Sequence, residues 1–278
     1  MNYYELSVQL SNFDQWNDIL VAYLAELDFE SFQEESPNVR AYIQESAYNG
    51  ASLQALFNQL QADEQVIQSF QVKLIPRQNW NAQWESQFEP VFIGEDIRVV
   101  APFHQLAPFD GIEIMIEPKM SFGTGHHQTT HLMCETMFEM DFSSKRVLDM
   151  GSGTGVLAIL AEKRGATDIV AIDIEEWSAE NCADNALRNS CTKIQSLHGG
   201  LEVIPTQEFD VILANINKNV LTAQMATYAA RMNSGAHLLL SGFFVSDTDE
   251  LKMLASHLNL HFTGQHEREG WAVLIFKK

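Results

Sequence analysis

The stretch VLDMGSGTG at residues 147–155 decides the fold of the larger part of this chain. It is typical of a buried strand that runs directly into a glycine-rich turn, and a helix is expected to follow from Val156. Glycine lets a backbone approach a ligand closely, and the first N–H groups of a helix have no partner within the helix. The stretch therefore predicts a βα turn that holds a nucleotide-like ligand.

The spacing of the glycines separates two candidate ligands. A nicotinamide dinucleotide site has the pattern G-x-G-x-x-G, which would require glycine at the position of Val156. The pattern here is G-x-G-x-G with Asp149 two positions ahead, which suits a cationic ligand without a pyrophosphate, such as S-adenosylmethionine. Asp173 ends the next strand, in VAIDI, where its carboxylate could accept both hydroxyls of a ribose. A glycine turn alone can be an ordinary βα turn, but the turn and this acid together favour a ligand.

From Lys145 onward, strands alternate with helices. Such alternation predicts an open, mostly parallel sheet with helices on both faces. The last two strands are too close in sequence for a crossover helix, so they should pair antiparallel. The strands are expected at residues 146–150, 169–174, 194–197, 209–214, 237–240, 261–265 and 271–276.

The N-terminal part has a different pattern. Apolar residues alternate at residues 4–10, and the chain then reads in the order β-α-β-β-α-β, with Ser36-Pro37-Asn38 as the turn of a hairpin. This order predicts a small α+β, ferredoxin-like domain. The expected elements are helices at 14–27 and 52–61 and strands at 29–34, 39–44 and 70–75.

These patterns predict two domains. The first covers residues 1–76, a linker with Trp80 and Trp84 covers residues 77–93, and the second covers residues 94–278. The second begins with two further strands, at 97–101 and 112–116, ahead of the alternating region.

Asn215 follows the fourth strand of the alternating region, in LANI. Ligands of open α/β sheets bind beyond the carboxyl ends of the strands, so Asn215 should face the reaction space. Its carbonyl oxygen could accept a hydrogen bond from an amine and orient it. An ordinary strand-end turn would also account for an asparagine here.

The segment SFGTGHHQTT at residues 121–130 predicts a structured loop. His126, His127 and His131 invite a metal-site interpretation, but no acidic or cysteine partner stands at a regular spacing, so no metal is expected. Thr129 or Thr130 is expected to cap the helix that follows, and a capping residue can also contact a ligand.

Composition narrows the classes of partner. The chain has 278 residues and a formal charge of −20, which disfavours nucleic acid and fits either a basic partner or simple solubility. Its three cysteines form no CxxC pair and are odd in number, which favours buried thiols in a reducing compartment. We see no apolar run of about 20 residues and no signal-peptide pattern, so we expect no membrane span and a cytoplasmic location.

Several segments together resemble the family of methyltransferases that modify ribosomal protein L-eleven of the bacterial large subunit. The resemblance covers nearly the whole chain, although the N-terminal part agrees in pattern and size more than in residues. The loop, the glycine turn and LANI form a highly specific combination. The segments are NWNAQWESQFEPVFIGEDIRVVAPF at 79–103, FGTGHHQTT at 122–130, VLDMGSGTGVLAI at 147–159, AIDI at 171–174, LANI at 213–216, LSGFF at 240–244 and WAVLIF at 271–276.

The resemblance implies a function for each domain. The N-terminal domain would recognise the ribosomal protein, and the C-terminal domain would be a seven-stranded, Rossmann-like class I methyltransferase domain that binds S-adenosylmethionine. The targets would be lysine ε-amines and an N-terminal α-amine. Asn215 would also hold the incoming amine, and Gly125 and Gly155 would support their loops. The implied cofactor-binding residues are Thr130, Gly151, Asp173 and Asn215, with Gly123, Thr124, Asp149 and Gly153.

For such a reaction the amine must lose its ammonium proton and attack the sulfonium methyl in line. No residue in the sequence is an obvious base, so we expect solvent to take the proton. Two other functions stay open: a methyltransferase of the same fold acting on another protein or a small molecule, and an S-adenosylmethionine-binding module without turnover.

Overall fold

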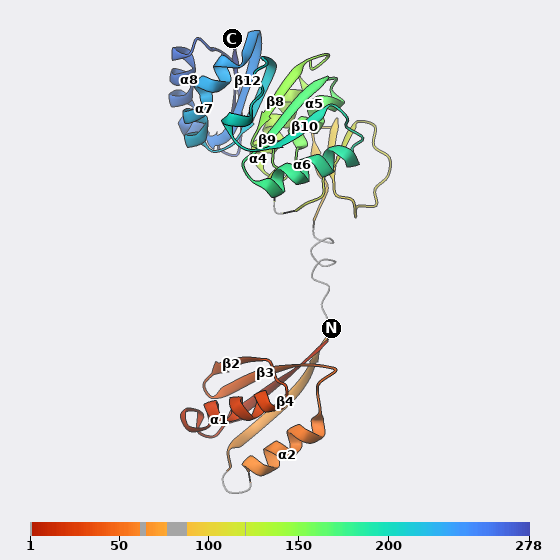
Figure 1. Ribbon diagram of the computed structural model, residues 1–278, viewed down its shortest axis with the longest axis vertical. Coiled ribbons are helices and arrows are strands. Elements are labelled where there is room, and N and C mark those ends of the chain that lie inside the picture. The colour runs from red at the N-terminus through yellow and green to blue at the C-terminus, as the bar shows by residue number, and fades with distance from the viewer. Residues whose placement is uncertain (1, 62–64, 77–87, 120) are drawn as a thin grey trace. The chain divides into compact units, whose positions relative to one another are not determined.

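The computed structural model describes residues 2–61, 65–76, 88–119 and 121–278 (Figure 1). The chain separates into two compact units, Met1–Gln87 and Phe88–Lys278. The expected linker at residues 77–93 falls mostly on residues 77–87, so Trp80 and Trp84 lie outside the described residues. Its last part forms strand β5, Val91–Ile93, in the second unit.

The first unit has the expected β-α-β-β-α-β order. Its sheet runs β2-β3-β1-β4 with every neighbouring pair antiparallel. Leu6 and Val8 of β1 point to one face because side chains alternate along a strand, and there they join an apolar cluster with Leu20 and Phe57 of the helices. The elements are β1 (Tyr3–Leu10), α1 (Phe13–Glu26), β2 (Ser31–Glu35), β3 (Asn38–Gln44), α2 (Gly50–Leu60) and β4 (Ile67–Ile75).

Three elements in this unit begin two or more residues away from the expected start. Strand β2 begins at Ser31 and not at Phe29. Helix α2 begins at Gly50, two residues early, because the side chain of Asn49 accepts hydrogen bonds from the N–H groups of Ala51 and Ser52 and so caps the helix. Strand β4 begins at Ile67 and not at Phe70, because its pairing with β1 continues to Leu10 across a register shift.

The second unit is built on a seven-stranded sheet of order β10-β9-β8-β11-β12-β14-β13. Strands β8 to β12 are parallel, and β14 pairs antiparallel with both β12 and β13, as expected. The strands are β8 (Arg146–Met150), β9 (Asp168–Asp173), β10 (Ile194–His198), β11 (Phe209–Asn215), β12 (Met232–Phe244), β13 (His261–Arg268) and β14 (Trp271–Lys277).

Strand β12 is far longer than the expected residues 237–240. Its pairing with β14 runs from His237 to Phe244, and the register shifts around Gly242, which has a φ of +95°. Glycine is unfavourable inside a strand. Because β12 contains Gly235 and Gly242, the sequence pattern predicted a strand that is too short.

Helices cover both faces of this sheet (Figure 1). Residues of α4, α5 and α6 form one buried apolar cluster, and residues of α7 and α8 form another on the opposite face. Among the described residues, no helix has both the length and the apolar character to cross a membrane. The helices are α4 (Gln128–Phe138), α5 (Val156–Lys163), α6 (Glu176–Arg188), α7 (Lys218–Ala230) and α8 (Thr248–His257), with short 3-10 turns η1 (Leu201–Val203) and η2 (Val245–Asp247).

A three-stranded sheet precedes these elements in the second unit. Strand β6 (Ile97–Val100) pairs antiparallel with β5 and parallel with β7 (Ile112–Met115). The sequence predicted β6 and β7 but not β5, which has only three residues.

Candidate functional site

The carboxyl ends of β8, β9, β10 and β11 meet at a cavity of about 620 Å³. Each of these strands contributes one residue at or just after its end to the cavity wall: Gly151, Asp173, Gly199 and Asn215, in that order. This is the edge at which open α/β sheets bind ligands. The sequence-predicted residues Gly151, Gly153, Asp173 and Asn215 all line it.

The glycine-rich turn adopts backbone conformations that favour glycine. Gly151 has a φ of +72° and Gly153 a φ of +53°. A Cβ atom on Gly153 would lie 2.2 Å from the carbonyl oxygen of Phe122, so no side chain fits there without moving the neighbouring loop. The backbone of the turn can therefore lie directly at the cavity, ahead of helix α5.

Asp173 is held in place by two backbone groups. The N–H of Gly153 donates to its Oδ2 at 2.8 Å, and the N–H of Glu175 donates to its Oδ1 at 3.0 Å. Each carboxylate oxygen can accept a further hydrogen bond, and the residue borders the cavity. The geometry of Asp173 is thus compatible with two hydroxyl donors from a ribose.

Asn215 has one satisfied and one unsatisfied amide atom. Its Nδ2 donates to the Oγ1 of Thr130 at 3.5 Å, the outer limit for a hydrogen bond. Its Oδ1 is buried and has no partner in the structure. Buried polar atoms nearly always have a partner, so this carbonyl oxygen indicates a place for a ligand donor. Thr130 is itself fully buried and supports Asn215 without lining the cavity.

The loop of residues 121–127 is tied to the glycine-rich turn. The N–H of Thr154 donates to the Phe122 carbonyl at 2.9 Å, and the Thr154 hydroxyl donates to the Gly123 carbonyl at 2.6 Å. Gly123 has a φ of +105°, and a Cβ there would meet the Thr154 hydroxyl at 2.7 Å. The two glycine-containing segments therefore position each other.

The cap of helix α4 differs from the expected one. His127 is the N-cap, with its Nδ1 accepting from the Thr129 N–H at 3.3 Å, and Thr129 and Thr130 already lie within the helix. An imidazole nitrogen can replace the usual hydroxyl or carboxylate oxygen of a cap because it is also a hydrogen-bond acceptor. Sequence preferences for capping residues favour threonine, which explains the different expectation.

Four of the predicted cofactor residues do not line the cavity: Gly123, Thr124, Thr130 and Asp149. The hydroxyl of Thr124 lies 3.1 Å from Nδ1 of His126, within the loop. Asp149 is buried, with both carboxylate oxygens unpartnered, and burial raises its pKa to about 7. Its negative charge acts on the buried thiols of Cys134 and Cys182, which places it on the face of the sheet that α4, α5 and α6 cover.

Four aromatic rings form a row, three of them at the cavity, and of the four only His127 was singled out from the sequence. The rings of Phe122 and His127 are 5.1 Å apart, those of His127 and Trp271 are 4.8 Å apart, and those of Trp271 and Phe244 are 4.2 Å apart. Phe122 is half exposed. Their residue types alone could not reveal this row, because the four residues come from three segments that only the tertiary structure brings together.

Trp177, Gln224 and Gly242 were also not singled out, and all three line the cavity. The indole of Trp177 is half exposed, beside Asp173 at the start of α6. A tryptophan four residues after the acid that ends a ligand-binding strand was a usable signal in the sequence.

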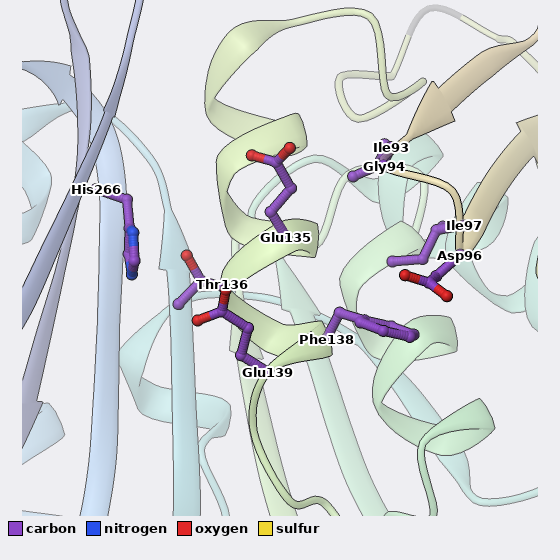
Figure 2. A pocket seen from close by; sticks show the side chains of 9 residues that line it. All are labelled: Ile93, Gly94, Asp96, Ile97, Glu135, Thr136, Phe138, Glu139 and His266. Atoms are coloured by element: carbon purple, nitrogen blue, oxygen red, sulfur yellow. The ribbon is translucent and has the colours of Figure 1, made fainter.

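A second cavity of about 370 Å³ lies around α4 (Figure 2). Glu135 comes from α4, Glu139 caps the C-terminal end of that helix, Asp96 lies in the turn between β5 and β6, and His266 comes from β13. None of the predicted site residues lines it. Within the described part of the chain, no group of three or more His, Cys, Asp or Glu side chains could hold a metal ion.

The fold and the larger cavity together define a Rossmann-like class I methyltransferase. The chain belongs to the ribosomal protein L11 methyltransferase family, whose model matches residues 8–278. It is 41% identical over 261 residues to the "Ribosomal protein L11 methyltransferase" of Porphyromonas gingivalis, covering 93% of this chain and 90% of that protein.

Two solved structures share the fold. The ribosomal protein L11 methylase from Lactobacillus delbrueckii subsp. bulgaricus superposes with a TM-score of 0.63 at 24% identity, over 68% of this chain and 98% of that one. The 16S rRNA N2 G1207 methyltransferase of T. thermophilus, solved with AdoMet and guanosine, superposes with a TM-score of 0.50 at 22% identity, over 57% of this chain and 45% of that one.

Proposed function

We propose that this protein transfers methyl groups from S-adenosylmethionine to amine nitrogens of ribosomal protein L11, at lysine ε-amines and the N-terminal α-amine. Family membership supports the substrate, since curated relatives carry this name. The observation that carries the chemistry is the buried, unpartnered Oδ1 of Asn215 at the edge of a cavity that also holds the glycine-rich turn and Asp173.

The residues present fit the cofactor. S-adenosylmethionine, when bound, supplies a methyl group on a positively charged sulfur. The glycine-rich turn offers bare backbone to the ligand, Asp173 keeps an acceptor site on each oxygen for the ribose hydroxyls, and Glu175 adds acidic character to the same wall. An acidic wall favours a cationic ligand.

Asn215 would orient the amine. Its Oδ1 would accept an N–H of the incoming nitrogen, which directs the nitrogen lone pair toward the methyl group. Thr130 would fix the orientation of the Asn215 amide, because its Oγ1 accepts a hydrogen bond from Nδ2. Positioning of this kind needs no change of protonation in the protein.

The amine must reach the site without its ammonium proton, and we propose that solvent takes it. His127 is the imidazole that lines the cavity, but its Nδ1 accepts from the Thr129 N–H, so the neutral ring carries its proton on Nε2. In that tautomer the remaining nitrogen, Nε2, already carries a proton and can only donate a hydrogen bond. His127 is therefore poorly arranged to act as the base.

The N-terminal unit would recognise the ribosomal protein, and the acidic charge of the whole chain would attract a basic substrate. We also propose a cytoplasmic location, where such a substrate is made and where the three buried thiols would stay reduced.

The test is transfer of radioactive methyl groups from S-adenosylmethionine to unmodified L11 by the wild type and by Asn215→Ala. We expect the variant to lose on the order of 100-fold in turnover, as after loss of an orienting hydrogen bond in other enzymes, with a much smaller change in cofactor affinity. Asn219→Ala is the matched control, because Asn219 is exposed on α7 and does not line the cavity.

Labelling by Asn215→Ala at the wild-type rate would show that Asn215 does not orient the amine. If the wild type binds S-adenosylmethionine but labels no L11, the substrate is another molecule or the protein is a non-catalytic binding module. Methyl transfer to any other protein or small molecule would show another substrate, and cofactor binding without transfer to any of them would show a non-catalytic module.

A further inference from the structure

Gln224, on helix α7, lines the larger cavity and has a buried partner one helical turn further on. Tyr228 is completely buried in the apolar cluster between α7, α8 and the sheet. Its hydroxyl donates a hydrogen bond to the Oε1 of Gln224. The two residues stand at i and i+4, so they lie on one face of the helix.

This contact fixes the orientation of the Gln224 amide. A buried tyrosine hydroxyl needs a hydrogen-bond partner, and Oε1 of Gln224 is the partner that the structure shows. The other end of the amide, Nε2, has no partner among the described residues. Nε2 can only donate, so Gln224 presents a fixed donor at the cavity wall.

Helix α7 and the residues that follow strand β10 both contribute to the lining of the cavity. Gly199 and Gly200, which follow β10, have no side chains, and α7 contributes the apolar Val220. Asn217, the N-cap of α7, also lines the cavity, and its Oδ1 already accepts from the Val220 N–H. The turn η1 that follows β10 packs into the same apolar cluster as Tyr228. Helix α7 and the turn η1 therefore lie on the same face of the sheet.

We propose that Nε2 of Gln224 donates a hydrogen bond to an acceptor nitrogen of the adenine ring of S-adenosylmethionine, and that Tyr228 is the positioning residue that orients it. This inference rests on the proposed function, because it assumes that cofactor. With Asp173 at the ribose and Asn215 at the reacting end, the adenine would extend toward Gly199 and Gly200. Ring nitrogens of adenine accept hydrogen bonds, which matches a side chain that can only donate.

The experiment measures the dissociation constant of S-adenosylhomocysteine by titration calorimetry. Gln224→Leu removes the donor, and Gln224→Glu keeps an acceptor for the Tyr228 hydroxyl but has no amide N–H. We expect both variants to bind roughly threefold to tenfold more weakly, the effect of one neutral hydrogen bond. Thr222→Ala, at an exposed position of the same helix, should bind like the wild type.

Tyr228→Phe tests the positioning role. It should weaken binding by a smaller factor in the wild type and by nothing further in the Gln224→Leu background, because Tyr228 acts only through Gln224. A purely structural role would weaken binding equally in both backgrounds. Melting temperatures of the unliganded variants show whether each is folded.

Analogues of S-adenosylhomocysteine that lack one ring nitrogen locate the contact. The wild type should bind one of the 1-deaza, 3-deaza and 7-deaza analogues more weakly than the parent, and Gln224→Leu should lose that discrimination. Unchanged binding by Gln224→Leu, or a raised KM for L11 with unchanged cofactor binding, would overturn the assignment. A wild type that binds no S-adenosylhomocysteine would instead contradict the proposed function.

Discussion

At the scale of single residues, the buried carboxyl group of Asp149 is the most unusual feature. Neither oxygen has a hydrogen-bond partner within normal distance and angle, and burial raises its pKa to about 7 although the backbone N–H of Ala158 acts to lower it. In the unfolded chain an aspartate has a pKa near 3.9. Between these values the native state therefore binds more protons than the unfolded state, so stability falls as the pH rises and levels off above about pH 7.

Asp149→Asn should remove this pH dependence. At about pH 8 the buried charge costs on the order of 4 kcal/mol, whereas a buried amide costs about 1–3 kcal/mol, so the variant should be the more stable protein. At about pH 5 the carboxyl is mostly protonated when folded, and the advantage should vanish or reverse. Urea unfolding without cofactor at both pH values measures this.

Asp141→Asn is the control, because Asp141 is exposed and its pKa is lowered by hydrogen bonds from Ser143. It should not gain stability at the higher pH. An Asp149→Asn variant that is equally destabilised at both pH values would mean that the carboxylate has a favourable partner in solution.

At the scale of elements, the glycine-rich turn and the loop of residues 121–127 depend on each other. Backbone and hydroxyl groups of Thr154 bond to Phe122 and Gly123, and Gly153 leaves room for the Phe122 carbonyl. The loop carries Phe122 and His127 into the cavity. A substitution in the glycine-rich turn should therefore also shift the aromatic rings of Phe122 and His127.

Gly153→Ala should lower cofactor affinity by at least about tenfold and destabilise the fold by roughly 1–3 kcal/mol, because the new Cβ collides with a backbone oxygen at a positive φ. Calorimetric titration and thermal melting measure the two effects. Gly94→Ala separates their causes, since Gly94 has a similar φ of +60° but nothing within 4 Å of the added Cβ. If both variants lose the same stability and affinity, the collision with Phe122 has no role.

At the scale of the whole molecule, the formal charge of −20 bears on substrate binding. A basic protein is attracted over long distances, and salt screens this attraction with a Debye length of about 10 Å at 0.1 M.

We therefore expect the KM for L11 to rise severalfold between about 0.05 M and 0.3 M salt, with kcat nearly unchanged, because charge steering affects encounter more than chemistry. Steady-state methylation assays at a series of salt concentrations measure this. The dissociation constant of S-adenosylhomocysteine is the internal control and should change little. A KM that does not depend on salt would show that the negative charge serves solubility and not docking.

The sequence by itself determined the order of elements in the first unit, the parallel and antiparallel parts of the large sheet, and four residues that line the cavity: Gly151, Gly153, Asp173 and Asn215. These could be predicted because a turn that needs glycine and an acid that ends a strand are local features of the chain. The end of the fourth strand is equally local, and parallel strands bring such ends to one edge.

Only the tertiary structure decided the rest of the site. Trp271 meets His127 from more than a hundred residues away, and Gln224 receives its orientation from the core through Tyr228. It also decided that Asp149, next to the glycine-rich turn, is buried away from the cavity that its neighbours line. Which side chains face a ligand depends on contacts between distant elements, and a local sequence pattern contains no record of those contacts.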